Sequence, residues 1–220
     1  MSVEKDSPEI AKMLAGEPYL ALIDPVMLKL KARARNLQYK LNNYPPSLYK
    51  DGITPEETFG GVDGKKYEVI AELFDVSLEK AKKLAIEPPF YCDHGVFIEF
   101  KGSFYCNYNT TILDCAKVTI GDRVAFGPNV SIYAATHSTE VEERLEDLER
   151  AYPVEIGDDV WIGGSVTIVC SAKGTRIGNG CTVAAGTTLW GTFPDNVVIA
   201  GNPPKIIKHL KPASEAAAER

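Results

Sequence analysis

Hydrophobic residues in the second half of the chain return at every sixth position. The spacing is kept at nine positions, which are Ile120, Phe126, Ile132, Ile156, Ile162, Ile168, Ile177, Val183 and Leu189. A period of six fits neither an amphipathic helix, with about 3.6 residues per turn, nor strands that alternate between long turns. It is typical of a hexapeptide β-helix, in which short strands form the sides of a triangular coil and small residues turn its corners. A β-sandwich with chance spacing is the alternative interpretation.

Two interruptions of this spacing predict where the chain leaves the coil. Ile132 and Ile156 are 24 residues apart, so residues 137–153 are predicted to form a projecting loop. Ile168 and Ile177 are nine residues apart, which predicts a short bulge near residues 170–174. Earlier and less regular coils are indicated by Ile98, Phe104 and Thr110.

The first ninety residues have a different pattern and favour helices. Residues 9–15 and Pro25–Leu41 are rich in Leu, Ala, Lys and Arg, which are good helix formers. Asp24 is a suitable N-cap before Pro25. Two shorter helices are predicted over 69–73 and 78–84. The chain therefore divides into an N-terminal helical segment (1–90), a β-helix domain (91–204) and a C-terminal tail (205–220).

The composition is typical of a globular protein and argues against a nucleic-acid-binding or membrane-spanning one. The 220 residues are 45% hydrophobic and 25% charged, with a formal net charge of −6, which is ordinary for a globular protein and unlike a basic nucleic-acid-binding surface. No apolar run of about eighteen residues predicts a membrane span, and no apolar leader opens the sequence. The five cysteines form no CxxC pair and are interpreted as reduced thiols. We therefore expect a cytoplasmic protein without nucleic-acid or membrane partners.

The negative charge is concentrated in the projecting loop. Residues 138–155 contain seven acidic side chains against Arg144 and Arg150, a net charge of −5. A loop of this charge disfavours anionic ligands, so a neutral or basic small-molecule acceptor is expected.

Six segments resemble, in the same order, motifs of the maltose, galactoside and nodulation O-acetyltransferase family. They are Met13–Tyr19, Pro88–Gly95, Tyr105–Asn109, Ala135–His137, Ile156–Gly164 and Ala200–Pro204. The resemblance covers nearly the whole chain. It implies a left-handed parallel β-helix, acetyl-CoA as co-substrate, no required metal, and a homotrimer with active sites between neighbouring subunits.

The resemblance assigns the central role to His137, one of only three histidines in the chain. Acetyl transfer to a hydroxyl needs a base to take the hydroxyl proton, and imidazole suits that task near neutral pH. His137 is therefore predicted to be the general base. Glu149 falls where related enzymes often place a carboxylate that orients the histidine. It is equally consistent with a solvated charge, in which case a backbone carbonyl would orient the imidazole.

Three further residues are candidates for contacts with the acceptor or the oxyanion. Asn107 resembles a polar residue that donates to the oxyanion or to a sugar hydroxyl, although an Asn also caps turns. Tyr105 is predicted to contact the sugar. Asp114 is predicted either to accept sugar hydroxyls or to satisfy backbone donors at an irregular corner. The galactoside enzymes have an acceptor-binding Asp at the next position, where this chain has Cys115, interpreted as an apolar filler.

The acetyl-CoA groove is predicted along the regular coils. Trp161 is flanked by inward-facing positions and should point outward, where it resembles the family's aromatic near the thioester. The remaining candidates are small residues beside the pantetheine arm and two lysines for the 3′-phosphate, namely Gly163, Gly164, Ala185, Lys205 and Lys208. The bulge at 170–174 is expected beside this groove.

These observations predict an acetyl-CoA-dependent O-acetyltransferase that acts on a sugar or sugar-like hydroxyl. One alternative is an acetyltransferase for a non-sugar or amino acceptor, which the Cys115 departure favours. The galactoside enzymes also have an acceptor-binding Asp near their N-terminus. It would fall near Leu20 or Ala21 of this chain, where no carboxylate is present. A catalytically silent β-helix that serves as an assembly module is the alternative from another class.

Overall fold

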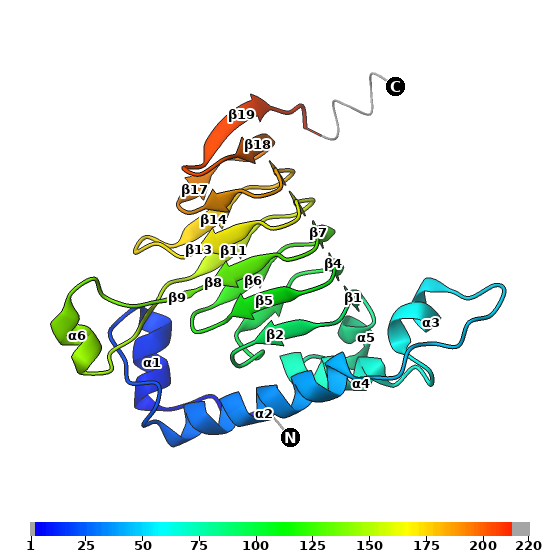
Figure 1. Cartoon of the computed structure of the whole chain (residues 1–220), viewed down its shortest axis with the longest axis horizontal. Coiled ribbons are helices and arrows are strands. Elements are labelled where there is room, and N and C mark those ends of the chain that lie inside the picture. Colours follow the sequence, from blue (N-terminus) through cyan, green and yellow to red (C-terminus); the bar gives the residue numbers. More distant parts are fainter. Residues whose placement is uncertain (1–2, 213–220) are drawn as a thin grey trace.

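A parallel β-helix stands on a base of helices in the computed structural model, which describes residues 3–212 (Figure 1). The first sheet contains β1 (Leu84–Ile86), β4 (Phe104–Cys106), β7 (Val124–Phe126), β12 (Trp161–Ile162), β15 (Thr182–Val183), β18 (Val197–Ala200) and β19 (Lys205–His209). The second sheet contains β2 (Phe90–Cys92), β5 (Thr110–Leu113), β8 (Ser131–Tyr133), β13 (Thr167–Val169) and β16 (Thr188–Leu189). The third sheet contains β3 (Ile98–Phe100), β6 (Val118–Ile120), β11 (Val154–Ile156), β14 (Thr175–Ile177) and β17 (Thr192–Phe193). The predicted hexapeptide β-helix is confirmed.

The periodic residues form the core by stacking on their counterparts in the next coil. Ile120 pairs with Ile156, which pairs with Ile177, all in parallel register. Each of the nine periodic positions is at most 1% exposed. Full burial of such a side chain stabilises the fold by roughly 1.5–3 kcal/mol. The period of six therefore corresponds to one side of the triangular coil, after which an equivalent inward position returns.

The corner that leads from the third sheet to the first is held by a column of side-chain oxygens. Asp122 Oδ1 accepts a hydrogen bond from the backbone N–H of Ser103 at 2.7 Å, and Asp158 Oδ1 accepts from the N–H of Asp122 at 2.8 Å. Asn179 Oδ1 accepts from the N–H of Asp158 at 2.8 Å. A glycine precedes each acceptor because there is no room for a side chain: a Cβ on Gly157 would lie 2.5 Å from Asn179 Oδ1.

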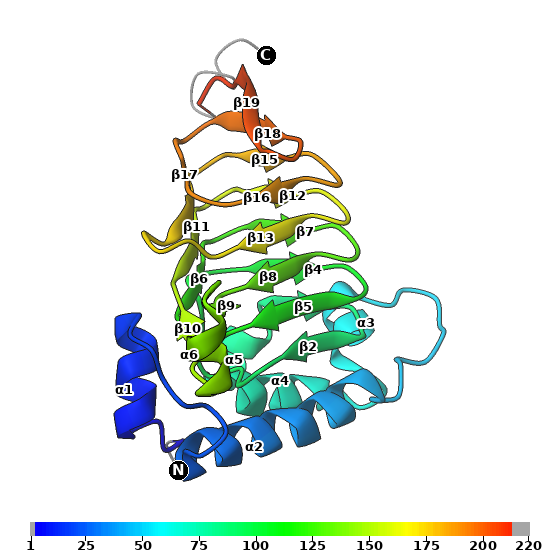
Figure 2. The same ribbon diagram turned by 60° about the vertical axis from the view of Figure 1, so that its left-hand side comes forward.

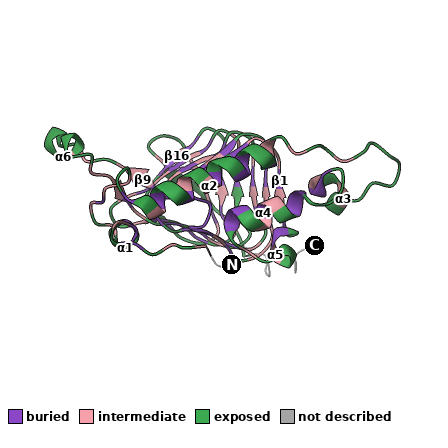
Figure 3. Cartoon of the chain, turned by 90° about the horizontal axis from the view of Figure 1, so that it is seen from below, coloured by how far each residue is buried: buried purple, intermediate pink, exposed green. Residues whose placement is uncertain are grey.

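Helix α2 (Pro25–Asn42) closes the lower end of the β-helix by bonding to the open edge of β2. Gln38 donates to the carbonyl of Cys92 at 2.8 Å and accepts from its N–H at 3.1 Å. Asn42 makes the equivalent pair with Phe90, at 3.0 and 2.8 Å. Four residues along a helix and two along a strand both cover roughly 6 to 7 Å, so the two side chains meet the strand in register. Seen from below, α2 exposes its other side to solvent (Figure 3).

The first two helices agree with the sequence prediction. They are α1 (Pro8–Ala15) and α2, and Asp24 caps the second by accepting from the N–H of Met27 at 2.8 Å. The next three helices are α3 (Pro55–Gly60), α4 (Lys66–Phe74) and α5 (Leu78–Ala81). Helix α3 was not predicted, although Thr54 and Glu57 form a capping box at its start.

The predicted helix over 78–84 is wrong in its last part. Helix α5 ends at Ala81, and Leu84 begins β1, whose alternating burial matches that of its partner β4. The side chains of Leu84 and Ile86 enter the core of the first coil, and this packing decides the conformation against helix propensity. The β-helix therefore extends beyond the expected boundary at residue 91. At the other end, β19 forms an antiparallel strand within the expected tail, of which residues 213–220 lie outside the described residues.

The projecting loop leaves and rejoins the coil between β8 and β11, as predicted. Its stem is an antiparallel pair of β9 (Ala135–Thr136) and β10 (Arg150–Ala151), and its tip contains α6 (Val141–Leu145), as Figure 2 shows. The bulge near Gly174 joins β13 to β14, so it lies at the corner between the second and third sheets. Gly163 lies at a different corner of the same chain, between the first and second sheets.

Candidate functional site

His137 lies at the rim of a pocket of about 290 Å³. Strand β8 carries the chain to the corner between the second and third sheets, and β9 then directs it outward immediately before His137. The side chain is exposed, and its imidazole has no hydrogen-bond partner among residues 3–212. The other polar or ionisable side chains that line the pocket are Tyr19, Lys31, Asp93, His94, Cys115 and Glu149.

Glu149 lines the same pocket and is held by Tyr19. The Tyr19 hydroxyl donates to Glu149 Oε2 at 3.0 Å, and the two residues also form a backbone bridge with hydrogen bonds of 3.1 and 2.9 Å. Tyr19 is fully buried, and burial raises the pKa of its hydroxyl, so it stays a neutral donor. The structure thus brings Glu149 to the pocket of His137, but the bond it shows for this carboxylate is to Tyr19.

Asp114 lies beneath the pocket and satisfies backbone donors. Its Oδ1 accepts from the N–H groups of Asp93 and His94 at 3.0 and 2.8 Å, and its Oδ2 accepts from that of Phe97 at 3.3 Å. It is completely buried, and desolvation raises the pKa of its carboxyl to about 7. This geometry corresponds to the alternative in which Asp114 organises an irregular corner.

Asp93 is the carboxylate that lines the pocket beside Cys115. Its Oδ1 is 3.1 Å from Lys31 Nζ, and its Oδ2 accepts a hydrogen bond from Cys115 Sγ at 3.2 Å. Burial raises the pKa of the Cys115 thiol well above its ordinary value, so it remains a protonated donor. Cys115 is therefore a hydrogen-bonding residue of the pocket as well as a small core residue.

A second group of candidates lies on the first sheet and at the corner between the first and second sheets. Asn107 and Gly163 lie two coils apart at this corner. The Asn107 N–H donates to the carbonyl of Phe126 at 3.1 Å, and the N–H of the next residue, Gly127, donates to the carbonyl of Ile162 at 2.8 Å. The side-chain Oδ1 of Asn107 accepts from the N–H of Tyr108 at 2.7 Å, so the carbamoyl NH₂ remains a donor. A Cβ on Gly163 would lie 2.6 Å from the backbone nitrogen of Ala185, so close stacking of the coils requires this glycine.

An outward-facing ladder on the first sheet aligns one predicted acceptor residue, Tyr105, with two predicted cofactor residues, Trp161 and Lys208. Tyr105 is aligned with Trp161 through β7, and Trp161 with Lys208 through β15 and β18. Trp161 points outward as predicted and is 58% exposed. Three strand spacings of about 4.8 Å place Lys208 roughly 14 Å from Trp161 along the sheet.

The remaining members of this group differ in exposure. Gly164 is half-buried and Ala185 is exposed, one coil apart at the same corner. Lys205 is exposed at the start of β19, opposite Ala200. The ring of Tyr105 contacts Phe59 of α3 edge-on, with centroids 6.2 Å apart, so it is held against the helical base.

The two groups lie on different sides of the chain. His137 follows β9 beside the corner between the second and third sheets, whereas Asn107 follows β4 and Trp161 belongs to β12 of the first sheet. Figures 1 and 2 show β9 and α6 on a different side of the coil from β4, β7 and β12. One side of the coil, about five extended residues or roughly 16 Å, separates the two corners. A single chain therefore does not bring the predicted base together with the predicted oxyanion donor.

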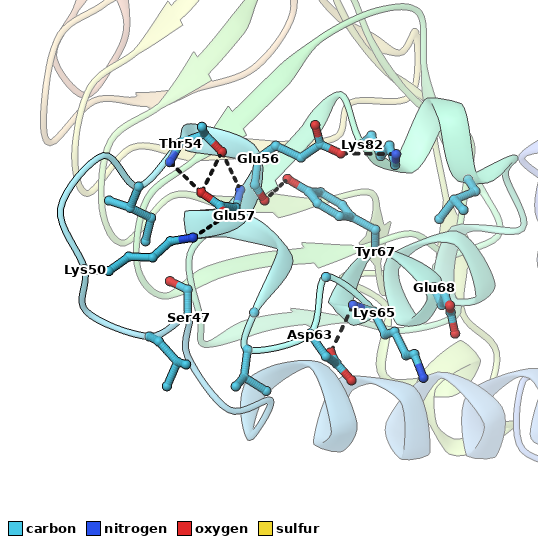
Figure 4. A pocket seen from close by; sticks show the side chains of 16 residues that line it. Ser47, Lys50, Thr54, Glu56, Glu57, Asp63, Lys65, Tyr67, Glu68 and Lys82 are labelled. Carbon is cyan, nitrogen blue, oxygen red and sulfur yellow. Dashed lines mark hydrogen bonds and ion pairs between the residues drawn. The ribbon is translucent and has the colours of Figure 1, made fainter.

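A larger cavity of about 660 Å³ lies beside α3 (Figure 4). Four of its charged side chains form two ion pairs, Lys50 with Glu57 at 2.6 Å and Lys82 with Glu56 at 3.1 Å. The Tyr67 hydroxyl donates to the carbonyl of Glu56 at 3.3 Å. No histidine or cysteine lines this cavity, and we place the chemistry at the smaller pocket.

Part of the negative charge of the loop is neutralised. Glu143 receives two hydrogen bonds from Arg150 Nη2, at 2.8 and 3.0 Å, which lower the pKa of its carboxyl. Glu155 belongs to β11 and faces Arg176 at 3.7 Å, away from the pocket. Four exposed acids remain on or beside α6, at Glu140, Glu142, Glu146 and Asp147.

Comparison with known proteins identifies the family to which this chain is similar. Residues 12–75 match the maltose acetyltransferase hexapeptide capping motif, and residues 153–190 match the hexapeptide repeat of succinyl-transferase. A Saccharomyces cerevisiae protein whose name proposes acetyltransferase activity is 42% identical over 201 residues, which cover 91% of this chain and 92% of that protein. The chain belongs to the hexapeptide-repeat acetyltransferase family.

Solved structures of acetyltransferases have the same fold along nearly the whole chain. A maltose O-acetyltransferase from Clostridium difficile 630 is 31% identical, with a TM-score of 0.78 over 95% of this chain and 100% of that one. A hexapeptide-repeat acetyltransferase from Vibrio cholerae, complexed with acetyl coenzyme A, is 29% identical, with a TM-score of 0.72 over 94% and 100% of the two chains. The family resemblance inferred from the six motifs is thus confirmed.

Two further structural findings concern the described part of this acetyltransferase. No three His, Cys, Asp or Glu side chains are grouped there so that they could hold a metal ion. None of the helices in residues 3–212 is long and apolar enough to cross a membrane.

Four polar residues of the pocket were not predicted from the sequence. Tyr19, Asp93 and His94 stand inside the quoted motifs, so the motifs carried a signal for them. Nothing in the sequence distinguishes Lys31 as a pocket residue, because it is one of several lysines and arginines on α2. Only the fold shows that it pairs with Asp93.

Proposed function

We propose that this acetyltransferase transfers the acetyl group of acetyl-CoA to a hydroxyl of a sugar or sugar-like acceptor, with His137 as general base. The supporting observation is the pocket that places an exposed, unpaired imidazole beside the carboxylates of Glu149 and Asp93. Family membership and the acetyl-CoA complex of the Vibrio cholerae relative support acetyl-CoA as the donor.

Each residue has a defined part in the proposed reaction. His137 takes the proton of the acceptor hydroxyl as its oxygen attacks the thioester carbonyl. The oxyanion that forms accepts a hydrogen bond from the Asn107 amide. The tetrahedral intermediate then collapses, the carbon–sulfur bond breaks, and the imidazolium returns the proton to the departing CoA thiolate. Glu149, fixed by Tyr19, orients the imidazole through the other ring nitrogen.

Acetyl-CoA is proposed to bind along the first sheet. Trp161 packs beside the thioester end, and the small corner residues Gly163, Gly164 and Ala185 let the pantetheine arm approach the backbone. Lys205 and Lys208 supply positive charge for the phosphates at the upper end. These residues fit an extended ligand because they follow one ladder and one corner of the β-helix.

The two separated groups support a homotrimer in which each active site lies between subunits. His137 of one subunit would face Asn107 and Trp161 of the next, because both groups are outward-facing and neither is complete alone. Closed cyclic symmetry builds identical sites of this kind from two different surfaces.

An amino acceptor is the second candidate. Four exposed acids on the loop and two carboxylates in the pocket favour a cationic amine over an anionic acceptor. The nucleophile would then be the neutral amine, and His137 would remove its proton during attack.

CoA release tests the function with a panel of mono- and oligosaccharides and amino sugars. We expect release with at least one acceptor and a loss of at least about 100-fold in kcat for His137→Ala. The control is His209→Ala, which changes an exposed histidine of β19 and should retain activity. NMR of the product distinguishes an ester from an amide. Full activity of His137→Ala, or no release with any acceptor, would contradict the proposal.

A further inference from the structure

A second histidine, His94, forms part of the pocket of His137 and has an unsatisfied nitrogen. It is only 3% exposed, and its Nδ1 has no hydrogen-bond partner among residues 3–212. A buried polar atom without a partner is rare in native proteins and destabilises the fold. Because this ring lines a pocket, a bound molecule is the natural source of the missing partner.

The ring of His94 is held in place by its surroundings. Its backbone N–H donates to Asp114 Oδ1 at 2.8 Å. Its ring contacts Phe97 edge-on, with centroids 5.6 Å apart and planes at 83°. A ring fixed in this way is preorganised for a ligand, since little further ordering is needed on binding.

The Lys31–Asp93 pair stands beside His94 in the same pocket. The two side chains are 35% and 17% exposed, so they are neither solvated surface groups nor sealed from the pocket. Asp93 accepts hydrogen bonds, Lys31 donates them, and the thiol of Cys115 fixes the second carboxylate oxygen at 3.2 Å. The pair therefore offers an acceptor and a donor side by side.

Burial keeps His94 neutral. Desolvation, opposed by Asp93 and reinforced by Lys31, lowers the pKa of the imidazole to about 4. A neutral imidazole has one N–H donor and one acceptor nitrogen, and a hydroxyl group complements either of them. A neutral histidine beside a charge-balanced pair favours an uncharged ligand with several hydroxyls.

We propose that His94 binds one hydroxyl of the acceptor, while Asp93 and Lys31 bind a neighbouring hydroxyl, so that the pocket selects neutral polyhydroxylated acceptors. This inference rests on the proposed function and assigns specificity to His94 as distinct from the base, His137. Acetyl-CoA is predicted to make no contact with His94.

Steady-state kinetics with His94→Phe tests the assignment. Phenylalanine keeps the edge-on contact with Phe97 and removes both nitrogens. We expect the KM for the acceptor to rise about 10-fold while the KM for acetyl-CoA stays unchanged. His94→Asn, which restores an amide near the position of Nδ1, should recover part of the loss. His209→Phe is the matched control on the exposed strand β19, and it should change neither constant.

Monodeoxy derivatives of the best sugar in the panel identify the contact. One derivative should lose about 10-fold in kcat/KM with the unaltered protein and nothing further with His94→Phe, because the same hydrogen bond is absent in both cases. An unchanged acceptor KM in His94→Phe, with the unaltered protein active, would overturn the inference.

Nitrogen-15 NMR of the imidazoles gives a readout that does not depend on a variant that folds. Saturating acceptor should shift the His94 ring nitrogens, and no shift would overturn the inference. A chain that releases no CoA with any acceptor would instead contradict the proposed function. The two failures are therefore distinguishable.

Discussion

Complementation between two inactive variants tests the division of the site between subunits. His137→Ala removes the base, and Asn107→Ala removes the oxyanion donor, so each variant alone should keep about 1% of the activity or less. Each subunit of one variant still carries the residue that the other lacks. Because the two residues lie at different corners of the coil, a mixed assembly recreates intact pairs of His137 and Asn107.

The recovered activity follows from the geometry. In an assembly of randomly mixed subunits at equal amounts, a site between two neighbours is intact when both neighbours are of the right type. This occurs for about one quarter of the sites, so the mixture should regain about a quarter of the unaltered activity. If both residues served the same chain, the mixture would regain nothing, because every chain would still lack one of them.

A second mixture gives an independent value for the fraction of intact sites. A double variant with both substitutions, mixed in equal amounts with the unaltered chain, leaves about one quarter of sites intact if they are shared and about one half if they lie within one chain. The assay is CoA release after joint unfolding and refolding, with native mass spectrometry to show that mixed assemblies form. Mixed assemblies without recovered activity in the first mixture would refute the reasoning.

Two further predictions concern stability. Gly157→Ala should destabilise the protein by about 1–3 kcal/mol in urea unfolding, because its Cβ would lie 2.5 Å from Asn179 Oδ1 in the column of Asp122, Asp158 and Asn179. Gly186→Ala, where nothing lies within 4 Å but φ is +73°, should cost about 1 kcal/mol. Gly157 lies outside the left-handed region, so an unchanged stability of Gly157→Ala would contradict the close contact at this corner. A further prediction concerns pH. Burial lowers the pKa of His94 to about 4 in the folded state, whereas the pKa in the unfolded state is about 6.5. Between these two pH values the unfolded state binds more protons, so lowering the pH from about 6.5 to about 4 removes up to about 3 kcal/mol of stability through this side chain. His94→Phe should therefore lose less stability than the unaltered protein between pH 7 and pH 4, at equal protein concentration, and parallel pH curves would contradict this. Asp114 acts in the opposite direction in both proteins, since burial raises the pKa of its carboxyl to about 7.

The coil could be predicted because its information is local in the sequence. Each inward position is six residues from the next, and Ile162 needs only its neighbours one coil away to be buried. The projecting loop could be located for the same reason, since it interrupts a regular count. The first strand, Leu84–Ile86, could not, because nothing nearby distinguishes it from the end of a helix until β4 pairs with it.

The site depends on contacts that no sequence window contains. Tyr19 and Glu149 are 130 residues apart, yet their hydrogen bond holds a carboxylate in the pocket that the predicted base also lines. Gln38 and Cys92 are 54 residues apart, and their bonds fix the helix that brings Lys31 to Asp93. The helical base therefore has two roles: it closes the open strand edge, and the same helix supplies the cation of the pocket that His137 lines. A change that loosens α2 should then disturb this pocket before the β-helix itself, because the coils above β2 pair with one another without it.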